Sequence, residues 1–279
     1  MPAAPHRPMV LARGAALAAA AVLALGVLAA APAAAQSPAD PAPPTLLVGA
    51  GGRFCVDPRF ATIPEAVAAA PAGATIRVCR GVYRDTAVID KPLTLLGAQE
   101  GVDARTGRPN LRTESIIDAP VGGIVIAPGV TGVTIDGFMI RNGGGGAVDG
   151  IDASGGTGGL TLVNNLIAQA IDGITLDADG AAPSTVAGNR MVGNVTGIRL
   201  TGSGAGTSVR DNAVELSTEI GVRLEASTAG VAVTGNQVSG SGVVDCLDDS
   251  VGTGTAGTAN TWTGNAGSLS SPAGLCAPS

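Results

Sequence analysis

Short runs in which apolar and polar residues alternate recur along most of the chain, at a spacing of 23 to 29 residues. Within a run every second residue is apolar, which is typical of a strand with one buried face. Three such runs, separated by Gly or Asn turns, make up each copy of the repeat. Because one copy alone cannot bury its apolar face, the pattern predicts coils that stack into a solenoid with a continuous core.

One column of equivalent positions marks the copies of the repeat, with an apolar residue three positions before each member. The column consists of Phe138, Asn165, Asn189, Asn212, Asn236 and Asn265. We expect the asparagines to form a structural ladder of stacked amides at a sharp corner, because Asn tolerates the left-handed backbone that such a corner needs. The alternative is that the column is a ligand-binding strip. In the last copy the spacing stretches, and Val244 is the expected counterpart of Val222.

The residues before the repeat predict a helix that precedes the first coil. Thr62 and Glu65 match a capping box, and Pro64 falls in the first turn. With the strand-like segment 73–83 and the repeat that follows, this module resembles the start of right-handed parallel β-helix proteins of the pectin-lyase-like family. The resemblance covers about residues 55–265. It implies an all-β fold, a right-handed parallel β-helix (solenoid) with a short N-terminal capping helix.

Composition divides the chain into three segments. Residues 1–35 combine a basic start, an apolar stretch rich in Ala, Leu and Val, and an Ala-x-Ala ending, which predicts a secretory signal peptide. An uncleaved membrane anchor is the alternative. Residues 36–54 form a Pro/Ala linker and lead-in, and residues 55–279 form the β-helix with disulfide-bonded ends. We therefore expect a secreted protein, extracellular or at the cell surface, with no membrane contact after signal cleavage.

All cysteines lie in the part of the chain that would be exported, at Cys55, Cys79, Cys246 and Cys276. An even number of cysteines in an oxidising compartment predicts disulfides. Three pairings are possible on paper, and the sequential one would place one bridge at each end of the solenoid. A metal site is the alternative, although no Cys-x-x-Cys spacing occurs and the only histidine lies in the signal segment.

Charge and composition narrow the range of partners. Without residues 1–35 the chain keeps 14 basic and 22 acidic residues, a net charge of −8. An acidic surface argues against nucleic acid as a partner, and we expect a monomer. The absence of histidine from this part excludes His-based acid–base chemistry. Only five aromatic residues are present, although grooves that bind sugars commonly stack aromatic rings on the sugar faces.

Acidic residues give the best candidate for chemistry. They are Asp149, Asp152, Asp172 and Asp177, and two of them, Asp149 and Asp172, precede the glycines that open adjacent coils, 23 residues apart. Those two should therefore stack at about 4.8 Å, where carboxylates repel unless a cation or proton intervenes. A calcium site at Asp149 and Asp172, or a carboxylate pair for glycoside hydrolysis, would satisfy this requirement. The ordinary alternative is turn chemistry, because Asp before Gly is common in turns.

A second column places Thr175, Arg199 and Arg223 on the outer surface of successive coils. We expect Arg199 to reach Asp177 or Glu225, because alternation puts these side chains on one surface. Such a column is either a surface ion-pair ladder or a site for acidic sugars, whose carboxylates Arg binds with a paired fork.

The function that follows is less sharply defined than the fold. The leading hypothesis is a non-catalytic extracellular or cell-surface protein that binds polysaccharide along one flank and needs no cofactor. The alternative is a carbohydrate-active enzyme, of polysaccharide lyase or glycoside hydrolase type, that uses the aspartate cluster, with calcium as its cofactor. The resemblance implies no choice between the two, because one fold hosts many activities.

Overall fold

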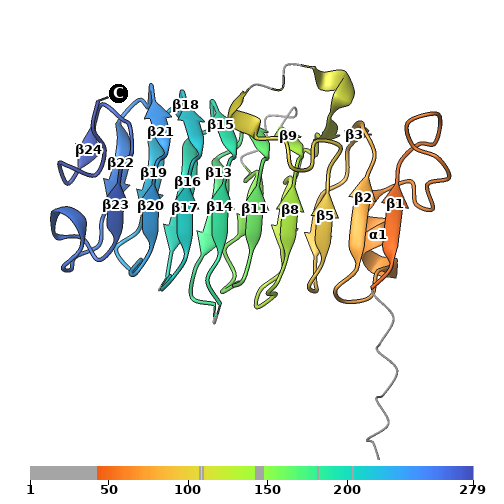
Figure 1. The fold of residues 1–279 in the computed structure, drawn as a ribbon, viewed down its shortest axis with the longest axis horizontal. Helices are drawn as coiled ribbons and strands as arrows, with labels where there is room; N and C mark the ends of the chain where they lie inside the picture. The colour runs from red at the N-terminus through yellow and green to blue at the C-terminus, as the bar shows by residue number, and fades with distance from the viewer. Residues whose placement is uncertain are drawn as a thin grey trace, which may run out of the picture. The chain divides into compact units, whose positions relative to one another are not determined.

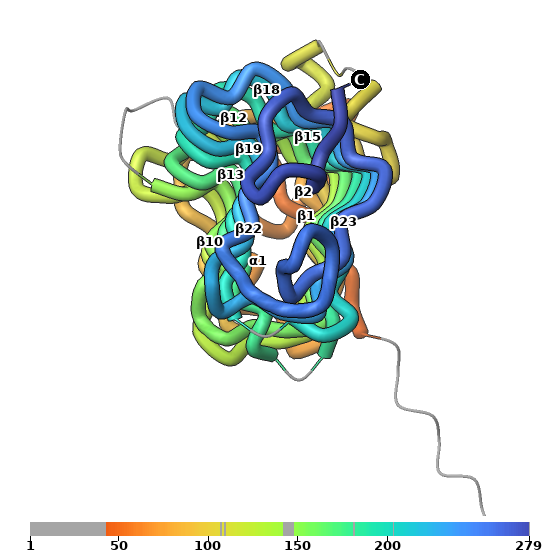
Figure 2. Tube along the Cα trace, turned by 90° about the vertical axis from the view of Figure 1, so that its left-hand side faces the viewer, coloured from red at the N-terminus to blue at the C-terminus, as the bar shows by residue number. Residues whose placement is uncertain are grey.

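The computed structural model describes residues 43–278, apart from residues 107, 109, 142–147, 181 and 203. The described part folds as a parallel β-solenoid, which confirms the predicted all-β architecture (Figure 1). Seen along the stack, successive coils lie over one another (Figure 2). The predicted signal peptide, residues 1–35, and residues 36–42 of the predicted linker lie outside the described residues.

Each coil contributes strands to three parallel sheets. The nine-stranded sheet contains β1 (Thr45–Val48), β2 (Thr75–Val78), β5 (Thr94–Leu96), β8 (Thr134–Asp136), β11 (Thr161–Val163), β14 (Thr185–Ala187), β17 (Ser208–Arg210), β20 (Ala232–Thr234) and β23 (Thr261–Thr263). The eight-stranded sheet contains β4 (Ala87–Ile89), β7 (Ile124–Ile126), β10 (Ile151–Ala153), β13 (Asp172–Asp177), β16 (Thr196–Thr201), β19 (Ile220–Leu224), β22 (Val244–Asp248) and β24 (Ser270–Ser271). The seven-stranded sheet contains β3 (Gly81–Tyr83), β6 (Ser115–Ile117), β9 (Met139–Arg141), β12 (Leu166–Ala168), β15 (Arg190–Val192), β18 (Ala213–Glu215) and β21 (Gln237–Ser239).

The register of the sheets explains why the same residue type recurs in every coil. Ile151 pairs with Ile174, which pairs with Ile198, and this residue pairs with Val222. All four are fully buried in the core of the solenoid. Repetition of a β-branched residue at one inward position therefore lets each coil bury its apolar face against the next.

A short helix, α1 (Ile63–Ala69), precedes the first complete coil and packs against β1, β2 and β4. It begins with the predicted capping box, in which the Glu65 amide donates to the Thr62 hydroxyl at 3.3 Å and the Thr62 amide to the Glu65 carboxylate at 3.2 Å. At its other end, the Lys91 ammonium donates to the Val67 carbonyl at 3.0 Å. Three further one-turn 3₁₀ segments lie outside the sheets: η1 (Ala104–Thr106), η2 (Leu111–Thr113) and η3 (Thr255–Gly257).

The asparagine column lies at the corner between the nine-stranded and seven-stranded sheets. The Asn189 side-chain amide donates to the Asn212 side-chain oxygen at 3.0 Å, and the Asn212 amide donates to the Asn236 oxygen at 2.9 Å. Each of these oxygens also accepts the backbone N–H of the preceding asparagine in the column. The same pattern joins Asn165 to Asn189, and Asn236 to Asn265.

The left-handed residue at this corner differs from the expectation. It precedes each member of the column instead of being the asparagine itself: Gly137 precedes Phe138, and Asn164, Gly188, Asp211, Gly235 and Gly264 precede the asparagines. The corner therefore separates two tasks. One residue turns the backbone, and the next, which is buried, uses its side chain to satisfy polar groups of neighbouring coils.

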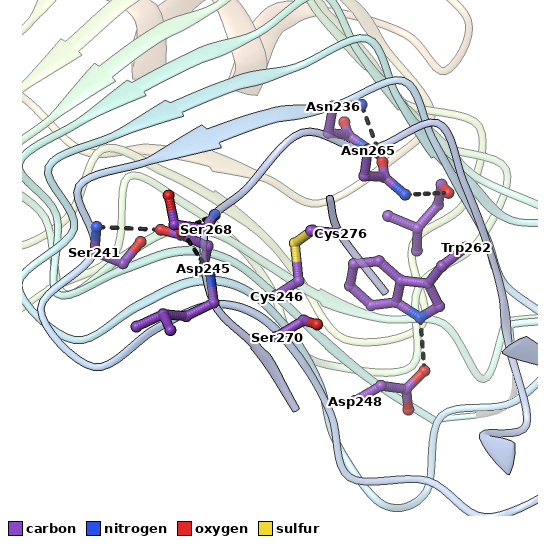
Figure 3. Close-up of a disulfide and its surroundings, with 12 residues drawn as sticks. Asn236, Ser241, Asp245, Cys246, Asp248, Trp262, Asn265, Ser268, Ser270 and Cys276 are labelled. Atoms are coloured by element: carbon purple, nitrogen blue, oxygen red, sulfur yellow. Dashed lines mark hydrogen bonds between the residues drawn. A yellow bond between two sulfur atoms is a disulfide. The ribbon is translucent and has the colours of Figure 1, made fainter. Parts of the chain in front are cut away.

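Disulfides join Cys55 to Cys79 and Cys246 to Cys276, with Cα–Cα distances of 5.8 Å and 6.2 Å. The pairing is thus the sequential one. In the last copy, Val222 pairs with Cys246 and not with Val244, which corrects the expected register. Cys246 takes the inward position and meets Cys276 beside the buried Trp262 and the end of the asparagine column (Figure 3).

Candidate functional site

The aspartates predicted to stack lie on neighbouring coils of the eight-stranded sheet. Asp172 begins β13, and Asp149 lies just before β10, the strand that pairs with β13. Both are followed by a glycine for a steric reason, because a Cβ on Gly150 would lie 2.6 Å from the carbonyl oxygen of Gly173 in the next coil. The two glycines therefore allow neighbouring coils to approach closely, and the aspartates before them lie at the same edge of the sheet.

A threonine hydroxyl bridges the two carboxyl groups. The Thr175 Oγ1 lies 2.8 Å from Asp149 Oδ2 and 3.2 Å from Asp172 Oδ2. The Asp172 backbone N–H also donates to Asp149 Oδ1 at 3.1 Å. Burial raises the pKa of Asp149, against the opposing effect of the hydrogen bonds from Thr175 and Asp172. A proton on Asp149 is one way to relieve the repulsion between the paired carboxyl groups.

Charged side chains continue from this pair along the sheet, one coil at a time. Arg199 Nη1 lies 3.5 Å from Asp172 Oδ2, and Arg199 Nε lies 2.9 Å from Glu225 Oε1. Arg223 contacts the same Glu225 oxygen at 3.1 Å and Asp249 Oδ2 at 3.3 Å. We call this row the charged track, and it consists of Asp149, Asp172, Arg199, Glu225, Arg223 and Asp249.

The carboxylates at the start of the charged track are more deeply buried than its arginines. The side chain of Asp172 is 6% exposed, whereas those of Arg199 and Arg223 are 41% and 33% exposed. Burial opposes the charge on Arg199, but Glu225 and Asp172 outweigh this effect and raise its pKa. The surface that the track offers to solvent therefore consists of the guanidinium groups of Arg199 and Arg223 together with the carboxylate of Asp249, whose side chain is 38% exposed.

The other predicted acids lie in strands, Asp152 in β10 and Asp177 at the end of β13, and both accept hydrogen bonds from backbone amides of the turns that follow. Asp177 accepts hydrogen bonds from the backbone of Gly156 and Asp179, both at 3.1 Å, and it forms no described ion pair with Arg199, which reaches Asp172 instead. Asp152 accepts from the Ser154 backbone at 3.0 Å. It also lines a hollow of about 250 Å³ beside Asp149.

The described residues contain no group of three or more His, Cys, Asp or Glu residues arranged to hold a metal ion. Asp149 and Asp172 are the two carboxylates that come together, and hydroxyl and guanidinium groups fill the places beside them. Near the C-terminal end, Asp245 and Asp248 also have internal partners. Asp245 accepts from the Ser268 backbone at 2.7 Å, and Asp248 accepts from the Trp262 indole at 2.8 Å (Figure 3).

A family model described as the right-handed β-helix region matches residues 95–266. The chain belongs to the right-handed β-helix family. Neither the comparison with curated proteins nor the comparison with solved structures gave a match. Within the described part of this β-helix protein, no helix is both long and apolar enough to cross a membrane.

The β-helix protein also has a hollow that none of the predicted catalytic or metal-binding residues line. This hollow of about 410 Å³ lies at the N-terminal end of the nine-stranded sheet, lined in part by Phe54, Arg77 and Arg80. The sequence contained a signal for it, because Phe54 precedes Cys55 and Arg80 follows Cys79. A disulfide between these cysteines brings the two backbone segments that carry Phe54 and Arg80 close together.

Proposed function

We propose that this β-helix protein is a secreted, non-catalytic protein, extracellular or at the cell surface, and that it binds polysaccharide along the charged track. The observation that carries the proposal is the repeated exposure of guanidinium edges at Arg199 and Arg223, on coils that stack directly. Successive coils lie about 4.8 Å apart, so an extended polymer that crosses these coils meets a donor on each of them. The two disulfides and the predicted signal peptide support secretion.

The partners of the aspartates favour binding over catalysis. Asp172 contacts Thr175 and Arg199, and Asp149 contacts Thr175 and the Asp172 backbone. A nucleophilic or basic carboxylate would have to leave these partners before it could act on a sugar. The same contacts suit a binding surface, because they hold the arginines in fixed positions at low entropic cost.

The test is retention of the purified mature protein on a panel of immobilised neutral and acidic polysaccharides. We expect retention on at least one polysaccharide, and a loss of about tenfold or more in the R199Q/R223Q variant, since hydrogen bonds to charged groups contribute strongly. Arg210→Gln is the matched control, because Arg210 is an exposed arginine on the nine-stranded sheet that pairs with its neighbour Asp211. No retention on any polysaccharide would contradict the proposal.

A second candidate function rests on the raised pKa of Asp149. A carboxyl group whose pKa is raised holds its proton to higher pH than an ordinary aspartate, which is the property that a general acid acting on a glycosidic oxygen needs. A carbohydrate-active enzyme of lyase or hydrolase type would then release product from the same polysaccharides, with or without added calcium. Loss of that product in Asp149→Ala and Asp172→Ala would establish this function, whereas wild-type protein that binds without releasing product would exclude it.

A further inference from the structure

The hollow at the N-terminal end of the solenoid has a floor formed by the outer face of the nine-stranded sheet. Leu47, Arg77 and Leu96 stand side by side there, because β1 pairs with β2 and β2 pairs with β5 in register. Phe54, from the segment that follows β1, and Glu100, from the segment that follows β5, also line the hollow. The hollow therefore lies on a different sheet from the charged track.

Phe54 is an exposed aromatic ring that contacts two guanidinium groups. The residue is 54% exposed, although large apolar residues elsewhere in the described chain mostly face the core. The guanidinium carbon of Arg80 lies 3.3 Å from the ring centroid, and that of Arg53 lies 4.3 Å from it. Stacking of this kind stabilises a guanidinium and fixes the plane in which its N–H groups point.

Positive charge is concentrated around the hollow, in a chain whose net charge is negative. Arg77 forms an ion pair with Glu100 at 2.7 Å. Within the described residues, neither Arg53 nor Arg80 forms an ion pair with a carboxylate. Arg77 and Arg80 line the hollow together with Glu100, and Arg53 stacks on the same Phe54 ring, while the sequence as a whole carries a net charge of −6. An anionic ligand would restore the local balance.

The shape and chemistry of the hollow select the kind of anion. A guanidinium stacked through its face keeps its in-plane N–H edge free, and this edge matches a planar carboxylate with two parallel hydrogen bonds. Glu100 and Gln99 line the same hollow and supply oxygen atoms that can accept from hydroxyl groups. The volume of about 410 Å³ is in the range of sites for small ligands.

We propose that this hollow binds a sugar acid, with its carboxylate on Arg80 and Arg77 and its hydroxyl groups on the polar rim. This proposal goes beyond the polysaccharide binding proposed for the charged track, and it does not depend on it. Phe54 acts as a positioning residue that holds the Arg80 guanidinium at the edge of the hollow. The disulfide between Cys55 and Cys79 keeps ring and guanidinium together.

The test is a titration of the mature protein with sodium glucuronate, followed by chemical shifts of the arginine side chains. We expect saturable binding of glucuronate, with glucose and acetate each at least about tenfold weaker, because each supplies only half of the required contacts. Arg80→Gln and Phe54→Leu should both weaken glucuronate binding, the former by about tenfold or more. Equal responses to glucuronate, glucose and acetate, or none at all, would overturn the proposal.

Two controls separate binding in the hollow from attraction to surface charge in general. Arg59→Gln removes an arginine stacked on a neighbouring ring, Phe60, outside the hollow, and it should leave glucuronate binding unchanged. If it weakens binding as much as Arg80→Gln does, general surface charge is responsible and the proposal is wrong. The R199Q/R223Q variant should bind glucuronate as wild type does. Loss of polysaccharide retention and loss of glucuronate binding can therefore be measured independently, and each proposal can fail on its own.

Discussion

The asparagine corner and the charged track both repeat once per coil, but they use their repetition in opposite ways. At the corner the side chains are buried, and each amide of Asn189 and Asn212 is bonded to the coils on both sides. On the charged track the arginines are partly exposed and their contacts are ion pairs with a few carboxylates. Stacking of identical groups is stabilising where each group is both donor and acceptor, whereas stacked charges need alternation of sign.

The largest loss of stability is expected when an asparagine of the corner is replaced. Asn212→Ala removes the oxygen that accepts from the backbone and the side chain of Asn189, at 3.0 Å each. Two buried donors then lose their partner, which costs about 1–3 kcal/mol each. We expect the free energy of unfolding in urea to fall by about 4 kcal/mol. A loss below about 1 kcal/mol would mean that the ladder contributes little to stability.

A smaller loss of stability is expected at the left-handed residue that precedes each asparagine of the corner. Asn164 has a φ of 54°, a conformation that costs a β-branched residue about 1–2 kcal/mol. Asn164→Val should therefore be less stable than Asn164→Gly by about that amount. Both variants lose the hydrogen bond from the Asn164 side chain to Asp136, at 2.9 Å. The difference between their thermal unfolding temperatures therefore measures the cost of the left-handed backbone alone. Equal stabilities would contradict the left-handed assignment.

The aspartate pair at the start of the charged track should make the free energy of unfolding depend on pH. The pKa of Asp149 is raised by burial, so the unfolded chain loses this proton at lower pH than the folded protein does. The contribution of Asp149 to stability is therefore greatest below its ordinary pKa and falls as pH rises through the raised value. We expect Asp149→Asn to gain stability relative to wild type as pH rises from about 3 to about 7.

Unfolding in denaturant at a series of pH values measures this difference. Asp152→Asn is the matched control, because Asp152 lies in the same hollow and accepts from a turn amide. If the Asp149→Asn curve stays parallel to that of wild type over this interval, the Asp149 carboxyl titrates normally and the candidate role as a general acid is lost.

The smallest effect is expected on the exposed part of the charged track. Arg223→Gln breaks the contacts with Glu225 and Asp249, and exposed ion pairs of this kind contribute about 0–1 kcal/mol. The free energy of unfolding should change by less than about 1 kcal/mol, and the change should shrink further in high salt. A larger loss would make the track a structural element like the corner.

Periodicity in the sequence predicted the fold because stacking makes one residue type recur at one position. Ile151 and Ile174, 23 residues apart, pair as expected. The same reasoning failed where the repeat itself changes. In the last coil the inward position keeps the spacing of 24 residues from Val222, but it is occupied by Cys246 and not by an aliphatic residue, so the aliphatic pattern indicated Val244.

The site was less predictable because contacts between charged groups depend on side-chain direction. The register places Arg199 beside Thr175, and its side chain reaches Asp172 and Glu225, whereas Asp177 is held by backbone amides of turns. No pattern in the chain pointed to the ion pair of Arg108 and Glu114, at 3.4 Å, whose side chains are only 3% and 0% exposed. Charged residues are seldom buried, so a pattern based on hydrophobicity assigns them to the surface.

The contrast between a corner that stabilises and a track that binds is tested most directly by polysaccharide retention of two variants, measured where both are folded. We predict that Asn212→Ala keeps wild-type retention, although it unfolds at a lower urea concentration. R199Q/R223Q should lose retention by about tenfold or more while it unfolds close to wild type. Full retention by R199Q/R223Q would contradict a binding role for the charged track.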